Sequence, residues 1–368
     1  MLRLDDREWK VFPLTGEDGL FPIHATSTGV DGIKLKEGKD AALPYITRTE
    51  TNNGIARFIS SVNLEYGKDE GGCITIGLDT QTAYWQPVDF ITGQNIHVLR
   101  SNKLNYFSYQ FLTVILRQQM KSKFNWGGNG ATLGRLKKLK IMLPVTDDGQ
   151  PDYQFMEDYV RELMSAKREQ YRRYVEKRLE SLGLDVANSG GYSEALKSRK
   201  WAEFFLEDLF TVSAGKRLTN ADKIDGSRPF IGATDNNNGI TGFVDNKNSS
   251  LDWNVLGVNY NGAPCIGFYH PYECIFTDDV KRLHLKNHED NPYILLFMKA
   301  VILQQRTKYN YGYKFNENRM LRQLLSVPVT VDGKPDYDFM EEFGRKMMSN
   351  KYNQYLAFLA MSDTVKAE

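Results

Sequence analysis

The chain has 368 residues, of which 41% are hydrophobic, 25% charged and 12% aromatic, and its formal net charge is +1. This length is enough for two or three domains, and this composition excludes a mostly disordered chain, a collagen and a coiled-coil rod. The 47 basic and 46 acidic residues balance, so the totals give no sign of a polyanionic partner.

The sequence carries no membrane or secretory signal. The longest apolar run, residues 294–303, contains Lys299 and is too short to cross a bilayer. The opening segment, MLRLDDREWK, is polar and acidic, unlike a signal or transit peptide. Three cysteines argue against a disulfide framework and fit a reducing compartment. We therefore expect a cytoplasmic protein that does not engage a membrane.

The chain is an internal duplication. Residues 45–59 (YITRTETNNGIARFI) match residues 230–244 (FIGATDNNNGITGFV) at seven of fifteen positions, with an offset of 185. Residues 143–159 match residues 327–343 at eleven of seventeen positions, with an offset of 184. This period is far longer than that of solenoid repeats, so the sequence predicts two whole domains in tandem.

Each unit opens with a W-x-x-F-x-L segment, at Trp9 and at Trp201, and continues into a part that is rich in glycine, asparagine and β-branched residues. Asn-Gly pairs occur where hairpin turns need a positive φ. The expected strands include residues 73–78, 95–99 and 265–269, the expected turns are Asn53-Gly54 and Asn238-Gly239, and helices are expected around residues 106–121 and 292–306.

Each unit ends in a long predicted helix. Pro151 and Pro335 suit a first helical turn, and the aspartates that follow them suit its dipole. Apolar residues at spacings of three and four form one stripe on each helix, and roughly 27–32 residues would span about 40–48 Å. Such a stripe needs a partner, and we expect the two helices to pair, although each could instead pack on its own domain. The predicted pairing residues are Phe155, Tyr159, Leu163, Val175, Leu179, Phe339, Phe343, Met347 and Leu359.

The sequence thus predicts five segments. Two globular domains are followed by one long helix each, and a linker that begins after Gly183 joins the units. The predicted boundaries are 1–150 for the first domain, 151–182 for the first helix, 183–199 for the linker, 200–334 for the second domain and 335–362 for the second helix.

Charge is unevenly distributed along the chain. Residues 90–146 hold nine basic residues and no acidic one, and residues 291–331 hold six basic residues and one acidic one. Lysine and arginine neutralise phosphates, and asparagine, glutamine and arginine can read base edges. A solvated basic face with core aromatics is the plainer alternative. The predicted DNA-binding residues are Arg48, Asn52, Asn53, Arg57, Lys121, Lys123, Trp126, Asn129, Arg135, Asn236, Asn237, Arg306, Lys308, Tyr309, Asn310, Tyr311 and Tyr313.

Positions that differ between the two copies are better candidates for specificity than positions that both copies share, because a shared residue can serve the common fold. Arg48 corresponds to Ala233, and Trp126 corresponds to Tyr311. These differing positions are the stronger specificity candidates, whereas Asn53 is expected to serve the turn.

Signatures of catalysis are missing from the sequence. It has no G-x-x-x-x-G-K-[ST] loop for ATP and no F-x-G-x-G segment for S-adenosylmethionine. Residues 290–293 (DNPY) lack the second proline of an adenine-methyltransferase motif and are expected to lead into a helix. Cysteines and histidines between Cys265 and His288 lack C-x-x-C spacing, so we expect structural residues rather than a zinc site. We predict no catalytic residue, no metal and no cofactor bound by this chain.

The tandem repeat, the W-x-x-F-x-L openings, the Asn-Gly region and the Leu-Pro-Val and Val-Pro-Val segments before the long helices resemble DNA-specificity subunits of type I restriction-modification systems. The related specificity subunits of type IIB enzymes are similar too. The likeness covers about residues 1–362. The Pro-Asp-Tyr segments at the helix starts differ from those common among type I members, so the subtype stays open.

This resemblance implies an α+β fold with two target-recognition domains, whose long helices pair antiparallel as a coiled coil. Each domain would read one half of a split site in double-stranded DNA. Adenine methyltransferase subunits and a nuclease or translocase subunit would dock on the chain. These partners would use S-adenosylmethionine, magnesium and, in some systems, ATP. Two alternatives remain open at this point: a duplicated-domain endonuclease that acts alone, and a duplicated module that binds a glycan or a protein.

Overall fold

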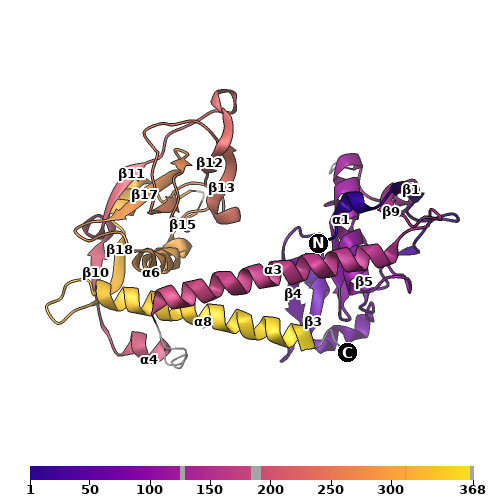
Figure 1. Ribbon diagram of the computed structural model, residues 1–368. Coiled ribbons are helices and arrows are strands. Elements are labelled where there is room, and N and C mark those ends of the chain that lie inside the picture. The colour runs from indigo at the N-terminus through magenta and orange to yellow at the C-terminus, as the bar shows by residue number, and fades with distance from the viewer. Residues whose placement is uncertain (125–128, 184–191, 311, 365–368) are drawn as a thin grey trace. The chain divides into compact units, whose positions relative to one another are not determined.

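The computed structural model describes residues 1–124, 129–183, 192–310 and 312–364 (Figure 1). The chain divides into two units, Met1–Tyr171 and Arg172–Glu368. Each unit contains mixed helix and sheet, as the predicted α+β class requires. The boundary falls inside the first long helix, so the second unit includes the C-terminal part of that helix.

The first unit is built on three small sheets. A four-stranded antiparallel sheet has the order β2-β8-β5-β6, a three-stranded sheet has the order β4-β3-β7, and β1 pairs with β9. The strands are β1 (Trp9–Pro13), β2 (Ile23–Ala25), β3 (Leu43–Ile46), β4 (Ile55–Ile59), β5 (Cys73–Gly77), β6 (Ala83–Gln86), β7 (Ile91–Thr92), β8 (Ile96–Leu99) and β9 (Lys140–Pro144).

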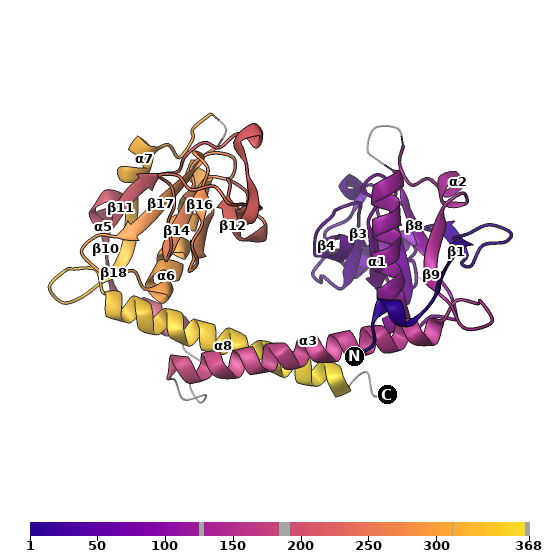
Figure 2. The same ribbon diagram turned by 45° about the horizontal axis from the view of Figure 1, so that its top comes forward.

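Helix α1 (Tyr106–Lys123) lies against the four-stranded sheet and forms the main core of the first unit with it. Asn105 caps this helix by accepting hydrogen bonds from the backbone N–H groups of Phe107 (3.0 Å) and Ser108 (3.1 Å). A short helix, α2 (Leu133–Leu136), follows α1 and leads into β9. The end of α1 points away from the long helix of its unit (Figure 2).

The second unit repeats this plan. Its sheets have the orders β11-β17-β14-β15 and β13-β12-β16, and β10 pairs with β18. The elements are α4 (Tyr192–Lys197), β10 (Lys200–Phe205), α5 (Leu206–Leu209), β11 (Phe210–Ala214), β12 (Asp225–Ile231), β13 (Ile240–Val244), β14 (Val255–Asn259), β15 (Gly267–His270), β16 (Ile275–Phe276), β17 (Val280–Leu285), α6 (Pro292–Leu303), α7 (Glu317–Leu321) and β18 (Leu324–Val329). Helix α6 occupies the place of α1 and packs on the sheet.

Part of the predicted linker is ordered structure of the second domain. Residues 184–191 lie outside the described residues, but α4 covers six residues of the segment assigned to the linker. The carbonyl of Leu196 accepts a hydrogen bond from the Trp201 indole (3.0 Å), just as that of Leu4 accepts one from Trp9 (2.8 Å). The glycine-rich sequence before α4 predicted a flexible connection, and nothing in it indicated the hydrogen bond between Leu196 and Trp201.

The long helices are α3 (Tyr153–Leu182, 30 residues) and α8 (Tyr337–Thr364, 28 residues). The aspartate before each one is its cap: the Asp152 carboxylate accepts from the N–H of Phe155 (2.9 Å), and Asp336 accepts from that of Phe339 (3.1 Å). Both aspartates are more than nine-tenths buried. The expected place of the aspartates at the helix starts is confirmed. The placement of Pro151 and Pro335 in the first helical turn is wrong, because both prolines lie in isolated bridges with Val145 and Val329 and the helices start two residues later.

The first turns of both long helices pack on their own domains, which corrects part of the predicted pairing stripe. Phe155 stacks on Tyr159 and lies under the guanidinium of Arg7 (5.1 Å), and Tyr159 meets Phe111 of α1 edge-on (5.8 Å). Each helix starts directly beside the strand that precedes it, so its first two turns face the core of that domain.

The second unit shows the same correction. Phe339 lies under Arg199 (4.3 Å), and Phe343 meets Phe297 of α6 edge-on (5.6 Å). Met347, one turn further along α8, also faces α6.

Helix pairing is visible within the second unit, where the last turns of α3 lie beside α8. The ring of Tyr174 meets that of Tyr352 edge-on (6.2 Å), and Arg345 donates to the carbonyl of Leu182 (3.3 Å). Since the later residue of α3 contacts the earlier residue of α8, the two segments run antiparallel. Val175, on this segment, is fully buried.

Candidate DNA interface

The two Asn-Asn-Gly turns have the same backbone conformation. Asn52, Asn53 and Gly54 have φ of 50°, 56° and 79°, and the matching residues 237–239 have φ of 49°, 54° and 76°. The positive φ predicted for the second asparagine and the glycine is confirmed. In each hairpin the turn is closed by a hydrogen bond from the glycine N–H to the carbonyl three residues earlier, at 3.0 Å and 2.9 Å.

Two predicted arginines of the first domain are exposed and already have partners. Arg48 forms an ion pair with Asp79, and Arg57 donates to the carbonyl of Gly32 (3.0 Å). The Cα of Arg48 also lies beside Gly77, at 3.8 Å from an ideal Cβ there. The turn that follows β3 therefore borders the loop between β5 and β6.

The end of α1 and the described residues from Asn129 onward are joined by hydrogen bonds. Lys121 and Lys123 are exposed, and the carbonyl of Lys123 accepts from the Asn129 carboxamide (3.0 Å). Arg135 donates to the carbonyl of Gly130 (2.9 Å). Asn129 and Arg135 thus hold backbone carbonyls on either side of residues 125–128, while the two lysines face solvent. Trp126 lies outside the described residues.

The matching loop of the second domain contains a stack of side chains. Arg319 lies 3.9 Å above the ring of Tyr313, and this ring stacks on Tyr309 at 5.7 Å with an interplanar angle of 10°. Tyr309 donates to the Gln323 side chain (2.6 Å), and its burial raises its pKa to about 12. Tyr313 is 48% exposed. Tyr309 therefore anchors the loop, and Tyr313 is its accessible aromatic.

Other predicted residues of this loop divide in the same way. Arg306 and Lys308 are exposed. The Asn310 side chain accepts from the backbone N–H groups of Gly312 and Tyr313, both at 3.0 Å, so it shapes the turn. Tyr311 lies outside the described residues. In the hairpin turn, Asn236 donates to Asp235 (2.9 Å), and Asn237 is exposed.

Sequence reasoning missed Arg319. It donates to the carbonyl of Lys314 (2.9 Å), as Arg135 does to that of Gly130. The two arginines lie 184 positions apart, so the repeat could have revealed the pair.

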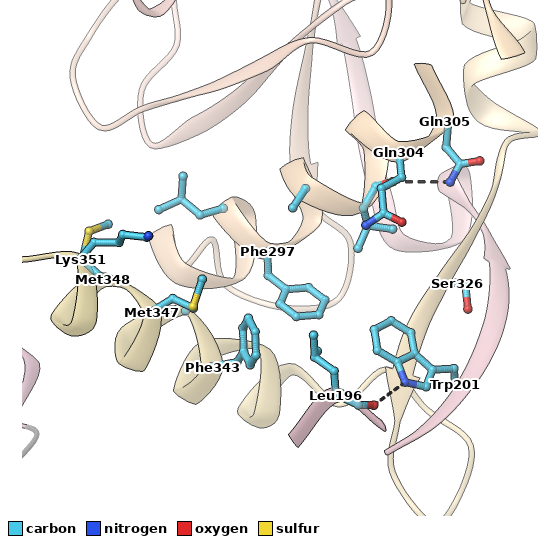
Figure 3. Close-up of a pocket in the computed structure, with 14 residues that line it drawn as sticks. Leu196, Trp201, Phe297, Gln304, Gln305, Ser326, Phe343, Met347, Met348 and Lys351 are labelled. Atoms are coloured by element: carbon cyan, nitrogen blue, oxygen red, sulfur yellow. Dashed lines mark hydrogen bonds between the residues drawn. The ribbon is translucent and has the colours of Figure 1, made fainter. Parts of the chain in front are cut away.

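A groove of about 560 Å³ lies between α6 and α8 of the second unit. Phe297 and Phe343 line its wall together with Trp201, and Met347, Met348 and Lys351 of α8 extend it (Figure 3). Trp201 stacks on Phe297 at 6.4 Å, just as Trp9 stacks on Phe111 at 6.0 Å. Predicted pairing residues thus also form the contact between helix and domain.

The three cysteines and His270 are fully buried. Within the described ranges, no group of three or more His, Cys, Asp or Glu side chains is placed to hold a metal ion. Burial raises the pKa of Cys73, Cys265 and Cys274 to about 12. Burial also lowers the pKa of His270 to about 4. The fully buried thiols are unsuited to act as nucleophiles.

His284 belongs to an ionic network at the end of β17. It donates to Asp290 (2.6 Å) and to Asp252 (3.1 Å), and Arg282 also donates to Asp252 (2.8 Å). The hydrogen bonds to Asp252 and Asp290 raise the pKa of His284 to about 9. Asn291 caps α6 by accepting from the N–H of Tyr293 (2.9 Å), so the segment resembling a methyltransferase motif leads into a helix, as predicted.

Comparison with known proteins identifies the family. The model of the type I restriction modification DNA specificity domain matches twice, at residues 6–171 and 198–355. The chain belongs to this family. It is a specificity subunit of a restriction-modification system with duplicated target-recognition domains, and not one of the two alternative classes.

Relatives of this specificity subunit include S.BcgI, the specificity subunit of a type II restriction enzyme from Heyndrickxia coagulans. The two are 39% identical over 322 residues, which are 86% of this chain and 89% of the relative. The type I S subunit structure from M. genitalium is 16% identical, with a TM-score of 0.48 over 100% of this chain and 96% of that one. The HsdS subunit from Thermoanaerobacter tengcongensis is 10% identical, with a TM-score of 0.33 over 96% and 91%. Within the described part of the specificity subunit, no helix is long and apolar enough to span a membrane.

Proposed function

We propose that this specificity subunit reads a bipartite site in double-stranded DNA, with one half-site per domain. The observation that carries the proposal is that both domains have one scaffold but different loops. The Asn-Asn-Gly turn and the arginine brace occur in both. Arg48 and the exposed Tyr313 each belong to one domain only.

The exposed lysines and arginines of these loops would contact phosphates and so supply affinity that depends on salt. Lys121 and Lys123 serve this role in the first domain, and Arg306 and Lys308 in the second. Base choice would come from Arg48 and Asn52 in one domain and from Asn237 and Tyr313 in the other.

The chain would perform no chemistry itself. We propose that adenine methyltransferase subunits and a nuclease subunit dock through α3 and α8, and that these partners use S-adenosylmethionine, magnesium and, in a type I arrangement, ATP. The relative at 39% identity belongs to a type II enzyme, which favours the type II arrangement. Action on DNA beside these partners would place the chain in the cytoplasm.

A domain exchange tests the division of labour. Residues 1–150 are replaced by those of another specificity subunit, and recognised sequences are selected from random duplexes. We expect a new sequence in one half-site and the original sequence in the other. Altered specificity in both halves would contradict reading by separate domains. Cleavage of plasmid DNA by the purified chain with magnesium would contradict a noncatalytic role.

Substitution in the long helices tests the docking of partners. Leu163→Asp together with Met347→Asp places charges on the apolar stripes of α3 and α8. We expect partner methyltransferase subunits to be lost from the complex on size-exclusion chromatography, while circular dichroism reports whether the domains stay folded. Glu176→Lys is the control, because this exposed residue of α3 is already charged. Unchanged assembly of the double variant would argue against the helices as the docking site.

A further inference from the structure

Each Asn-Asn-Gly turn has one asparagine that is held by the domain and one that is free of it. In the first domain, the carboxamide of Asn53 donates to the carbonyl of Trp85 (2.8 Å), and the backbone carbonyl of Asn53 accepts from Gln86 (3.0 Å). In the second domain, the carboxamide of Asn238 donates to the hydroxyl of Tyr272 (3.0 Å). The second asparagine therefore fixes the turn to the neighbouring hairpin in both copies.

The glycine of each turn is fixed as well. An ideal Cβ on Gly54 would lie 3.2 Å from the Tyr84 ring, and one on Gly239 would lie 3.2 Å from the Phe268 ring. Both glycines are buried. The backbone of each turn thus packs against an aromatic side chain. The side-chain hydrogen bond of the asparagine before the glycine also holds it in place.

The first asparagine of each turn has different surroundings from the second. Asn52 and Asn237 are exposed, and their carboxamides make no hydrogen bond within the parts of the chain that the structure describes. Their φ values of 50° and 49° lie in the left-handed region, which asparagine tolerates better than most residues. Residues held in such regions cluster at binding sites, where the surrounding structure maintains them. Each turn therefore presents one unengaged carboxamide from a rigid base.

We propose that Asn52 and Asn237 make the same contact with DNA, each reading an adenine at the equivalent position of its half-site. A carboxamide places an N–H donor beside a carbonyl acceptor, so it can donate to N7 and accept from the N6 amino group of adenine at once. Asn53 and Asn238 are positioning residues. This inference rests on the proposed function, because it requires that each domain reads one half-site.

The equivalence of the two turns predicts which base pair the two half-sites share. The loops around them differ: Arg48 of the first domain corresponds to Ala233. An identical residue with the same backbone φ, carried by the same fold, meets the same base when both domains dock on DNA in the same way. The two half-sites therefore share one A·T pair at equivalent positions, while their other bases differ.

Glycine is the substitution that removes the carboxamide and keeps the turn, because glycine adopts positive φ without strain. Asn52→Gly and Asn237→Gly are made in the full chain. Asn287→Gly is the matched control, since Asn287 is also exposed with φ of 65° but lies between β17 and α6, beside the start of α8. Recognised sequences are selected from random duplexes, and the affinities for the selected site and its single-base variants are measured.

We expect Asn52→Gly to reduce discrimination at one A·T pair of one half-site by about 5- to 150-fold. Asn237→Gly should do the same at the equivalent pair of the other half-site, and Asn287→Gly should change neither. Asn52→Asp should reproduce the loss at that pair, because a carboxylate accepts but cannot donate.

Three results would overturn the inference while the proposed function stands. They are unchanged specificity of both glycine variants, an equal loss on every sequence with a smaller salt dependence, which indicates a phosphate contact, and different bases at the two equivalent positions. A wild-type chain that selects no sequence at all would instead overturn the proposed function.

Discussion

The two domains share one backbone bridge, but the side chains that hydrogen-bond to its aspartate differ. Asp69 bridges to Phe90 in the first domain, and Asp252 bridges to Cys274 in the second. Asp69 accepts hydrogen bonds from Ser27 and from Thr28 (2.8 Å). Its counterpart accepts from Arg282 (2.8 Å) and His284 (3.1 Å). One domain uses neutral hydroxyl and amide donors where the other uses cations.

This difference shows what a duplicated fold preserves. The backbone register and the aromatic contacts between helix and domain are common to both copies. Different side chains can satisfy the carboxylate at this bridge, provided that the hydrogen bonds are made. The same freedom in the exposed loops would let the two domains read different DNA.

The strongest test of independent domains is removal of the matching aromatic from each one. Phe111→Ala and Phe297→Ala each delete a ring that is less than a tenth exposed and that packs on both a tryptophan and the long helix. Each should destabilise its own domain by about 3–5 kcal/mol. Pulse proteolysis in urea, with cleavage sites assigned by mass spectrometry, separates the two transitions. Equal destabilisation of both domains by one substitution would show that the two domains do not unfold independently.

The ionic network should make the second domain lose more stability than the first between pH 6.5 and 9, below the range in which the cysteine thiols of the unfolded chain ionise. The pKa of His284 is raised from 6.5 to about 9, so its stabilisation is full below pH 6.5 and is lost as the pH rises through 9. After allowance for its partial exposure, we expect a loss of about 1–3 kcal/mol. Urea unfolding followed by proteolysis between pH 6 and 10 measures it.

The variant His284→Asn is the control for this pH dependence, because it removes the titrating ring. Its second domain should be less stable at pH 6 and should lose the pH dependence below pH 9, where the buried thiols Cys265 and Cys274 contribute none, while the first domain is unchanged. A pH dependence that persists in the variant would assign the effect to another group.

The held asparagines should be equivalent in the two domains despite their different partners. Asn53→Ala and Asn238→Ala each lose one side-chain hydrogen bond and force alanine to a positive φ. We expect about 1–2 kcal/mol for each, with the glycine variants about 1 kcal/mol milder. Thermal unfolding of each variant checks this. A glycine variant as damaging as alanine would mean that the hydrogen bond, and not the backbone, dominates.

The smallest expected effect concerns the exposed lysines of the two loops. Lys123→Gln and Lys308→Gln should each lower the slope of log affinity against log salt by about 1 and leave sequence preference unchanged. Fluorescence anisotropy between 50 and 200 mM salt, concentrations chosen to span the sensitive range, measures the slope. Lys346→Gln on α8 is the control. A lower salt slope for only one of the two loop variants would show that the domains bind DNA unequally.

Local sequence was sufficient for the repeat, and it located the starts of the long helices to within two residues. The Pro-Asp pairs predict the caps at Asp152 and Asp336, and the Asn-Gly pairs predict left-handed turns, because these features depend on hydrogen bonds within a few residues. The apolar stripes likewise predict α3 and α8, since helical periodicity is a property of one segment.

Only the tertiary structure decided which partner each side chain contacts when that partner lies far away in the sequence. The stripe residue Tyr159 turns to Phe111, Tyr309 turns inward to Gln323, and Asn53, rather than Asn52, is held by Trp85. A periodic pattern shows that a side chain is buried, but the surface that covers it is supplied by strands and helices brought together in three dimensions. The net charge of +1 averages over two basic segments that are already distinct along the sequence, but only the fold shows which of their side chains are exposed and which shape the loops.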